Sequence, residues 1–423
     1  MGRATVGRGR AVRLGILGAA GACAVGLMVP TVAAAAPPVS PPAGATVVGT
    51  ASASCRNPAF AAIQPAVDAA TAGATIYVCA GTYTGPVTIT KKLRLLGAQY
   101  GRDARTGRTT AAQESVITSA GAGFTVGTVD GLTVDGFTFS GSTGDGIDAF
   151  QRGSGFTFVD NVFTDNQNGM NVDAAGPVRS TIARNRFTAN NRGIIGQAGT
   201  GVLFTSGAAN DVTVSDNLFE RHGSAAVNSI GDPNPANRSV GIVISTNRSV
   251  DDSSFAVINN ANGALVERNQ ATKAPSAEDG TIIFIVGNTD HLTVARNILS
   301  GDVGTGISAN AAFGAGPSTN LLIDSNVIRD RTTGISINDN HSSVTVRSNV
   351  VQNSTRSATA PGRGIRLQVG SSGVAVTSNA VSGSSDVDCV DESHGGGTVG
   401  TADTWTRNAG RTSTPPGLCI PGR

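Results

Sequence analysis

One eight-residue pattern recurs along the chain and constrains its fold more than any other feature. Val212–Phe219 reads VTVSDNLF, and close variants return at residues 156–163, 180–187, 292–299, 321–328, 344–351 and 374–381. Leu132–Phe139 (LTVDGFTF) is the same word, with Gly136 assigned to the place of the asparagine. A fixed word that recurs every 20–50 residues indicates a stacked repeat. The shared asparagines are Asn161, Asn185, Asn217, Asn269, Asn297, Asn326, Asn349 and Asn379.

Each word alternates apolar and polar residues, turns a corner at the asparagine, and ends in a short apolar pair. Alternation over four or five residues predicts a half-buried strand, and asparagine suits a corner because it tolerates the left-handed conformation. A second word, G-I-x-x, follows most corners, starting at Gly146, Gly169, Gly306, Gly334 and Gly364. Three short strands per coil predict an all-β fold, a right-handed parallel β-helix. Coils stacked about 4.8 Å apart would let the asparagines bond one another along the corner.

The spacing of the repeat is irregular in two segments. Between Asn185 and Asn217, both RGIIGQ from Arg192 and GVLFTS from Gly201 could supply the strand after the corner, and spacing favours the second. The 52 residues between Asn217 and Asn269 hold either one coil with a long insertion or two coils, and GIVIS from Gly241 favours an extra, degenerate coil. Residues 231–238 and 99–119 are expected to be loops.

The start of the chain has the order of a secretory signal peptide. Arginines lie among the first 13 residues, an apolar run covers Leu14–Val32, and a tract of small residues follows. This order predicts a signal peptide over residues 1–36 and an extracellular protein. We expect a flexible linker over 37–50, the β-helix over 51–391 and a C-terminal cap over 392–423.

Four cysteines remain after the predicted cleavage, and four allow three connectivities. Proximity in the chain favours Cys55–Cys79 and Cys389–Cys419, one bridge at each end. The end coils of a solenoid have no neighbour and need capping. Phe60, Ile63 and Val67 fall at helical spacing within Asn57–Gly73, which predicts a short helix over the N-terminal end.

Ala74–Ala98 is where a family resemblance emerges. The segment ATIYVCAGTYTGPVTITKKLRLLGA resembles the entry coil of secreted right-handed β-helix proteins of the pectin-lyase-like superfamily. The resemblance implies a substrate groove along the sheet of G-I-x-x strands. On that sheet the outward residues would be Asp148, Asn171, Ser308, Ser336 and Arg366, and, two residues on, Phe150, Asp173, Asn310, Asn338 and Gln368. Such a polar ladder suits an extended polysaccharide, although solvent-facing strand residues are commonly polar.

Thr143–Phe150 (TGDGIDAF) is similar to the NTDGID segment of polygalacturonase-type glycosidases. Asp145 and Asp148 match its two aspartates, whereas Gly144 replaces its threonine and the other motifs of those enzymes are absent. Asp148 and Asp173 would be diagonal neighbours about 7–8 Å apart. Carboxylates at such separations can act as acid and base in inverting hydrolysis. The resemblance therefore makes Asp145, Asp148 and Asp173 the candidate catalytic residues, against the alternative of a turn cap and solvated strand residues.

A lyase would use different residues. It needs a base such as Arg366 and a calcium ion held by carboxylates, with Asp339 and His341 in the adjacent loop. Against this, Asp388 could sit one coil above Arg366 and form an ordinary ion pair with it. Aromatic residues make up only 4% of the chain, and Phe150 is the main candidate to face a sugar.

The formal net charge of +2 lacks the basic stripe that nucleic-acid binding requires. After signal cleavage, we expect a monomer with no membrane association. The sequence assigns no resident cofactor or metal. Two hypotheses remain: a secreted hydrolase or lyase that binds and cleaves a polysaccharide, and a non-catalytic extracellular β-helix that binds polysaccharide or has a structural role.

Overall fold

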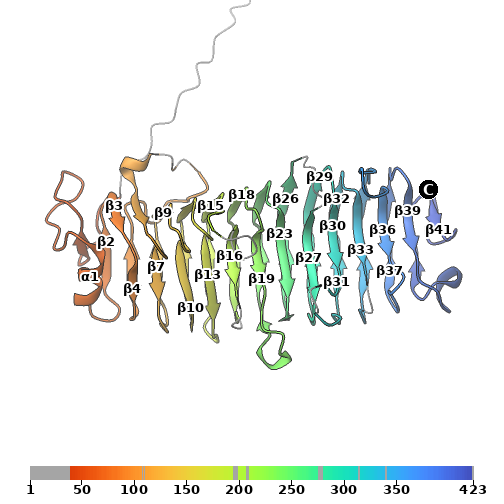
Figure 1. Cartoon of the computed structure of the whole chain (residues 1–423), viewed down its shortest axis with the longest axis horizontal. Helices are drawn as coiled ribbons and strands as arrows, with labels where there is room; N and C mark the ends of the chain where they lie inside the picture. The colour runs from red at the N-terminus through yellow and green to blue at the C-terminus, as the bar shows by residue number, and fades with distance from the viewer. Residues whose placement is uncertain are drawn as a thin grey trace, which may run out of the picture. The chain divides into compact units, whose positions relative to one another are not determined.

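A computed structural model describes residues 39–421, except 107, 109, 194–198, 206–208, 275–279, 313–314 and 339–340. These residues belong to one compact unit that begins at Ala35. Three parallel sheets of stacked short strands form a right-handed β-helix, which confirms the predicted fold (Figure 1). The predicted signal peptide and Asp339 lie outside the described residues. Within the described part, no helix is long and apolar enough to cross a membrane.

The first sheet has 14 strands and contains the alternating part of the repeated word. Its strands are β1 (Thr46–Val48), β2 (Thr75–Val78), β5 (Arg94–Leu96), β8 (Thr133–Asp135), β11 (Thr157–Val159), β14 (Ser180–Ala183), β17 (Val212–Ser215), β21 (Val243–Ser245), β25 (Leu265–Glu267), β28 (Thr293–Ala295), β31 (Leu322–Asp324), β34 (Thr345–Arg347), β37 (Ala375–Thr377) and β40 (Thr404–Thr406).

The second sheet has 12 strands and contains the apolar residues after the corner. Its strands are β3 (Gly81–Thr84), β6 (Ser115–Thr118), β9 (Phe137–Ser140), β12 (Val162–Thr164), β15 (Arg186–Thr188), β18 (Leu218–Glu220), β22 (Arg248–Val250), β26 (Gln270–Lys273), β29 (Ile298–Gly301), β32 (Val327–Arg329), β35 (Val350–Gln352) and β38 (Ala380–Ser382).

The third sheet has 13 strands and contains the G-I-x-x words, so we call it the G-I-x-x sheet. Its strands are β4 (Val87–Ile89), β7 (Phe124–Val126), β10 (Ile147–Gly153), β13 (Met170–Ala174), β16 (Thr200–Phe204), β19 (Ala225–Ser229), β23 (Ser254–Asn259), β27 (Thr281–Gly287), β30 (Thr305–Ala309), β33 (Thr333–Ile337), β36 (Arg363–Leu367), β39 (Val387–Asp391) and β41 (Ser413–Thr414).

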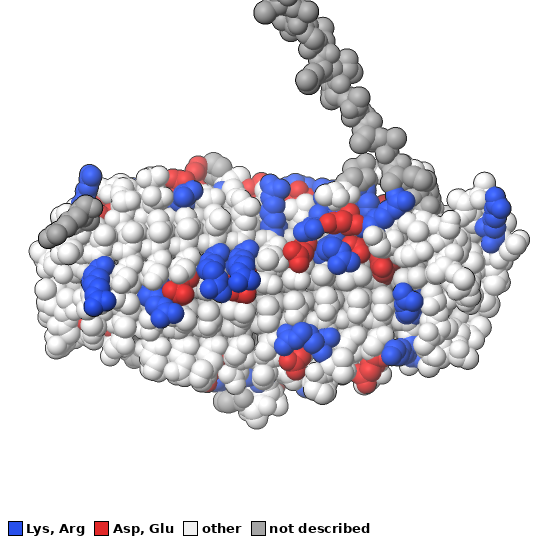
Figure 2. Space-filling view, turned by 180° about the vertical axis from the view of Figure 1, so that it is seen from behind, with Lys and Arg blue, Asp and Glu red and all other residues white. Residues whose placement is uncertain are grey.

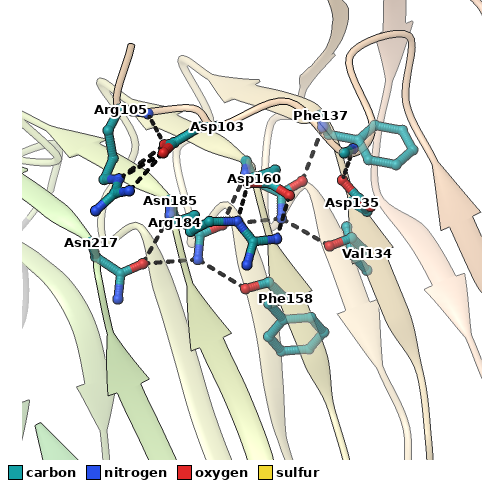
Figure 3. A network of polar contacts seen from close by, with 12 residues as sticks. Asp103, Arg105, Val134, Asp135, Phe137, Phe158, Asp160, Arg184, Asn185 and Asn217 are labelled. Atoms are coloured by element: carbon teal, nitrogen blue, oxygen red, sulfur yellow. Dashed lines mark hydrogen bonds and ion pairs between the residues drawn. The ribbon is translucent and has the colours of Figure 1, made fainter. Parts of the chain in front are cut away.

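Buried asparagines stack along the corner between the first and second sheets, as the repeat predicts. Asn185 is representative: its Nδ2 donates to the Phe158 carbonyl at 2.9 Å and to Asn217 Oδ1 at 3.1 Å (Figure 3). The side chain thus satisfies a buried carbonyl of the preceding coil, on β11, and bonds the asparagine of the following coil. The ladder contains the eight predicted asparagines and two more, Asn247 and Asn408.

The corner conformation differs from the expectation. The residue before each ladder asparagine adopts the left-handed conformation, with φ between 54° and 57° from Asp160 to Arg407. The asparagine turns inward to bond the ladder, and the residue before it takes the left-handed position. Assigning Gly136 to the asparagine place was therefore wrong, because Gly136 (φ 78°) is the left-handed residue and Phe137 occupies that place. The backbone N–H of Phe137 donates to Asn161 Oδ1.

Both irregular regions follow the favoured alternatives. β16 begins at Thr200 and pairs with β13 and β19, so the segment from Gly201 supplies the strand. β21–β23 form the extra coil between Asn217 and Asn269, with Asn247 at its corner. The asparagine ladder therefore continues without a gap through both regions, from Asn185 to Asn269.

The interior is filled by apolar side chains stacked in register. Phe139, Phe163, Phe187 and Phe219 are fully buried, and their rings stack with centroids 4.8–4.9 Å apart. This distance equals the spacing of the coils, so identical residues at identical positions stack without adjustment.

A helix covers the N-terminal end, as predicted, and it is shorter than the predicted segment Asn57–Gly73. α1 (Ile63–Ala69) buries Ile63, Ala66 and Val67 against the first coil, and Cys55 pairs with Cys79. Phe60 precedes the helix and bridges to Val48. Within the segment expected to be a flexible linker, β1 pairs with β2, so strand pairing begins before residue 51.

The C-terminal segment continues the stack. Cys389 pairs with Cys419, and β40 and β41 pair with β37 and β39. The Trp405 indole covers the last coil and donates from Nε1 to Asp391 Oδ2 at 2.8 Å. The region expected to be a cap therefore contains part of a further coil.

Figure 2, which views the molecule from the side opposite to Figure 1, shows Lys and Arg side chains beside Asp and Glu side chains in several clusters. Among the ion pairs between neighbouring coils, Arg184 pairs with Asp160 at 2.7 Å, Arg296 with Glu267 at 2.6 Å and Arg347 with Asp324 at 3.1 Å. In each pair the arginine is exposed and the carboxylate is largely buried. Ion pairs at the surface contribute about 0–1 kcal/mol each.

The charged loop before β6 lies against the corner between the first and second sheets, where it contacts Asp135, Asp160 and Arg184. Asp103 pairs with Arg105, and the backbone N–H of Gly101 donates to Asp135 Oδ1 at 2.8 Å (Figure 3). A nearly buried ion pair, Arg108–Glu114, holds the loop further along. The loop is thus attached to the corners of three coils.

Replacing one ladder asparagine tests the ladder. Asn297→Ala would remove the acceptor of two Asn269 N–H groups and the donor to the Val266 carbonyl. We expect the free energy of unfolding to fall by about 2–4 kcal/mol, because buried polar groups lose their partners. Urea unfolding measures the change. Asn262→Ala, an exposed position on β24 (Ala261–Asn262), is the matched control, and an equal effect at both positions would contradict the structural role of the ladder.

Candidate functional site

The strand register places the five predicted outward residues in one row on the G-I-x-x sheet. Asp148 lies beside Asn171, and Ser308 beside Ser336, which lies beside Arg366. Four further residues complete what we call the outward row: Leu203, Asn228, Val257 and Phe284. Eight steps of about 4.8 Å make the row about 38 Å long.

The centre of the outward row is apolar, which the sequence analysis missed. The middle coils lack the G-I-x-x word, so their outward residues were not assigned. Strand alternation supplies the missing signal: in TIIFIVG, Ile283 and Ile285 are fully buried, so Phe284 between them faces outward. The half-buried Phe284 ring therefore lies at the middle of the row, far from Phe150.

A cleft of about 520 Å³ opens over these middle strands. We call it the central cleft. None of its described lining residues carries a charge, and hydroxyl and amide groups surround the apolar centre. The lining residues are Ser224, Asn228, Ser229, Ile230, Ser253, Ser254, Val257, Asn259, Phe284 and Val286.

Two aspartates with raised pKa values lie at the N-terminal end of the row. Burial raises the pKa of Asp145 to about 6, and the nearby charge of Asp148 contributes to the rise. A hydrogen bond of 2.9 Å from Asn168 Nδ2 to Asp145 Oδ1 opposes it. Burial also raises the pKa of Asp148, whose Oδ1 is buried and accepts no hydrogen bond in the described structure. The two carboxyl groups are thus close enough to influence each other.

Asp173 lies diagonally from Asp148, as expected, across an irregularity in β10. Its side chain is almost fully buried, and Oδ1 accepts the backbone N–H of Thr205 at 3.1 Å. The Thr205 hydroxyl lies 3.2 Å from Asn171 Oδ1. Asp173 therefore positions Thr205 beside Asn171.

Arg366, at the other end of the row, forms an ion pair with a residue other than the expected one. Its guanidinium donates to Glu392 at 2.7 Å, and Arg363 lies 3.3 Å from the same carboxylate. The predicted pairing with Asp388 was wrong, because Asp388 lies beside Gly364 and accepts backbone N–H groups of Arg411 and Thr412.

Of the remaining predicted residues, some lie along the G-I-x-x sheet and one, His341, is buried at a corner of the coil. Ser336 donates to Asn338 at 2.9 Å, and Asn310 and Asn338 follow the row's Ser308 and Ser336. His341 is buried, and its Nδ1 accepts the Ser318 backbone N–H at 2.8 Å. Among the described residues, no group of three or more His, Cys, Asp or Glu side chains could hold a metal ion.

Residues 79–255 match the family model of the right-handed β-helix region. The match covers fewer than half of the residues of the chain, and it agrees with the right-handed parallel β-helix that the three sheets form. No curated protein matches the chain in sequence.

Several solved structures are similar to this chain at low identity and with TM-scores below 0.5. One is a mutant of the periplasmic alginate epimerase AlgG (TM-score 0.43, 13% identity, 80% of this chain and 77% of that one). Another is the catalytic unit of a GH87 α-1,3-glucanase from Streptomyces thermodiastaticus (TM-score 0.49, 12% identity, 90% and 71%). A third is a mannuronic acid specific family 6 lyase from human gut microbiota (TM-score 0.45, 13% identity, 81% and 76%). The similarity is one of fold alone.

Replacing Asp145 tests its raised pKa. A carboxyl whose pKa is higher in the folded state than in the unfolded state costs stability as pH rises from about 4 through about 6. Asp145→Asn removes this cost, so we expect its stability relative to wild type to increase from pH 4 to pH 7, by about 1–2 kcal/mol after allowance for solvent screening. Urea unfolding at both pH values measures the difference.

Asp165→Asn is a control whose stability relative to wild type should change with pH in the opposite direction. Arg192 lowers the pKa of Asp165, so this variant should lose stability relative to wild type as pH rises. A stability difference for Asp145→Asn that does not change with pH would contradict the assignment.

Proposed function

We propose that this protein is extracellular and binds an extended polysaccharide along the outward row of the G-I-x-x sheet. The observation that carries the proposal is the uncharged central cleft, with Phe284 and Val257 at its centre and amide and hydroxyl groups around them. A sugar ring has apolar C–H faces and a hydroxyl-bearing edge, so it suits an aromatic surface with nearby hydrogen-bonding groups.

The polar residues on either side of the cleft would extend this surface. A polymer running along the row would meet Asn171 on one side and Asn310, Asn338 and Arg366 on the other. Ser308 and Ser336 lie in the same row and are buried, so they would support this surface from below. Glu392 balances the charge of Arg366, so this end offers hydrogen bonds more than net charge. We assign buried His341 no direct contact with the polymer.

Hydrolysis at the acidic end is a second candidate function. It is favoured by the unpartnered Asp148 Oδ1 and by the raised pKa values of Asp145 and Asp148. A protonated carboxylic acid can donate to the glycosidic oxygen as the bond breaks, while an ionised carboxylate activates water. Because the pKa of Asp145 is raised to about 6, we assign the acid role to Asp145, the base role to Asp148 and a positioning role to Asp173.

The binding proposal predicts that Phe284→Ala weakens binding about tenfold or more, which corresponds to a loss of about 1.4 kcal/mol of aromatic contact. Isothermal titration calorimetry on a panel of soluble neutral and acidic polysaccharides measures the affinities. Ile298→Ala, an exposed position on the second sheet, is the control. Unchanged affinity in the Phe284 variant would contradict binding in the cleft.

The hydrolysis proposal predicts that Asp148→Asn abolishes release of reducing sugar ends while it leaves polysaccharide affinity within about twofold. Asp145→Asn should also lower the rate and remove a pH dependence near 6. Reducing-end release across the panel, measured from pH 4 to 8, tests both. If the wild-type protein binds a polysaccharide and releases no product, the hydrolase assignment is rejected and the non-catalytic alternative stands.

A further inference from the structure

The central cleft continues beyond the ends of its strands into a second cavity of about 400 Å³. We call this cavity the side pocket. Ile230 and Asn259 line both cavities, so the two meet at these residues. The side pocket is lined by Ile230, Gly231, Pro233, Asn259, Asn260, Asn288, Ala315 and Gly316.

An inserted loop, residues 231–238, forms one wall of the side pocket. It protrudes beyond the coils below β19 (Figure 1). Asn288 anchors it, because its Nδ2 donates to the Pro233 carbonyl at 3.0 Å and to Asn260 Oδ1 at 2.7 Å, while Arg238 donates to Asn288 Oδ1. The chain after the loop pairs as β20 (Ser239–Val240) with β24. The wall is thus attached at several points.

The direction that leads from the central cleft into the side pocket decides which part of a polysaccharide could occupy the side pocket. The central cleft extends from Ser224 and Ser254, at the starts of their strands, to Ile230 and Asn259 at the ends. The side pocket lies beyond those ends. Because the strands run across the outward row, a polymer that follows the row would pass over the cleft and leave the side pocket empty. A substituent that branches from the polymer at this point would enter it.

The chemistry of the side pocket suits a neutral sugar. None of its described lining residues is charged. Asn259 Oδ1 is buried at the junction and accepts no hydrogen bond in the described structure, so it can accept one from a hydroxyl group. The volume lies at the small end of the range for small-molecule sites, about 300–1,000 Å³.

We propose that the side pocket binds a neutral monosaccharide branch of the polysaccharide whose backbone lies along the outward row. This inference rests on the proposed function and narrows its substrate class to polysaccharides that carry single-sugar side chains.

Filling the side pocket tests the inference. A Cβ added at Gly316 would meet no atom within 4 Å, and the backbone there does not need glycine, so Gly316→Leu occupies the cavity without strain. Gly396→Leu, at a similarly open glycine in the C-terminal region, is the matched control. Ala315→Leu is a second filling variant for the case that the first is unstable in thermal unfolding.

The probes are branched oligosaccharides of galactomannan, xyloglucan and arabinoxylan, each beside its enzymatically debranched form, a manno-, cello- or xylo-oligosaccharide short enough to stay in solution. Calorimetry should show that wild type binds a branched form more tightly than its debranched form. Gly316→Leu should weaken binding of the branched form about tenfold, to the level of the debranched form, and leave the latter unchanged.

Two results would overturn the inference while the proposed function stands. One is equal binding of branched and debranched forms by wild type. The other is an equal loss of both forms in Gly316→Leu. Failure of wild type to bind any polysaccharide of the panel or any of these probes would overturn the proposed function, and this inference with it.

Discussion

The inward-facing asparagine ladder is the interaction on which the rest of the structure depends. Each amide bonds a carbonyl of the preceding coil and the asparagine of the following coil, as Asn185 does with Phe158 and Asn217. A buried amide without these partners would cost about 1–3 kcal/mol. Coils can therefore stack only in the register that aligns the asparagines, and the left-handed residue before each one is held in place by the same bonds.

This fixed register leaves the outward face of the G-I-x-x sheet free to vary. Its side chains carry little of the stability, so one row can be acidic at Asp148, apolar at Phe284 and polar from Ser308 onward. The loop over residues 231–238 shows the same freedom, since Asn217 and Asn247 bond each other directly across this insertion. A uniform scaffold thus supports a non-uniform surface.

The ion pairs between coils lie outside the central cleft. Arg184 pairs with Asp160 and Arg296 with Glu267 at the corner of the first sheet, and Arg366 pairs with Glu392 at one end of the outward row. The central cleft and the side pocket contain no charge among their described lining residues. Charges that join coils would impede a neutral polymer less if they lie away from the surface it contacts.

The sequence alone determined the β-helix and the positions of the corner asparagines, because both follow from a local pattern repeated many times. Proximity in the chain favoured the cysteine pairing that the structure shows, whereas the left-handed residue at each corner became clear only from the structure. The sequence also placed Asp148, Asn171, Ser308, Ser336 and Arg366 in one row, since identical words stack in identical register. Only the tertiary structure decided which coils interrupt that row with Leu203, Val257 and Phe284, because these coils lack the word. It also decided that Glu392 pairs with Arg366 and that residues 231–238 wall a pocket, since both depend on contacts between coils.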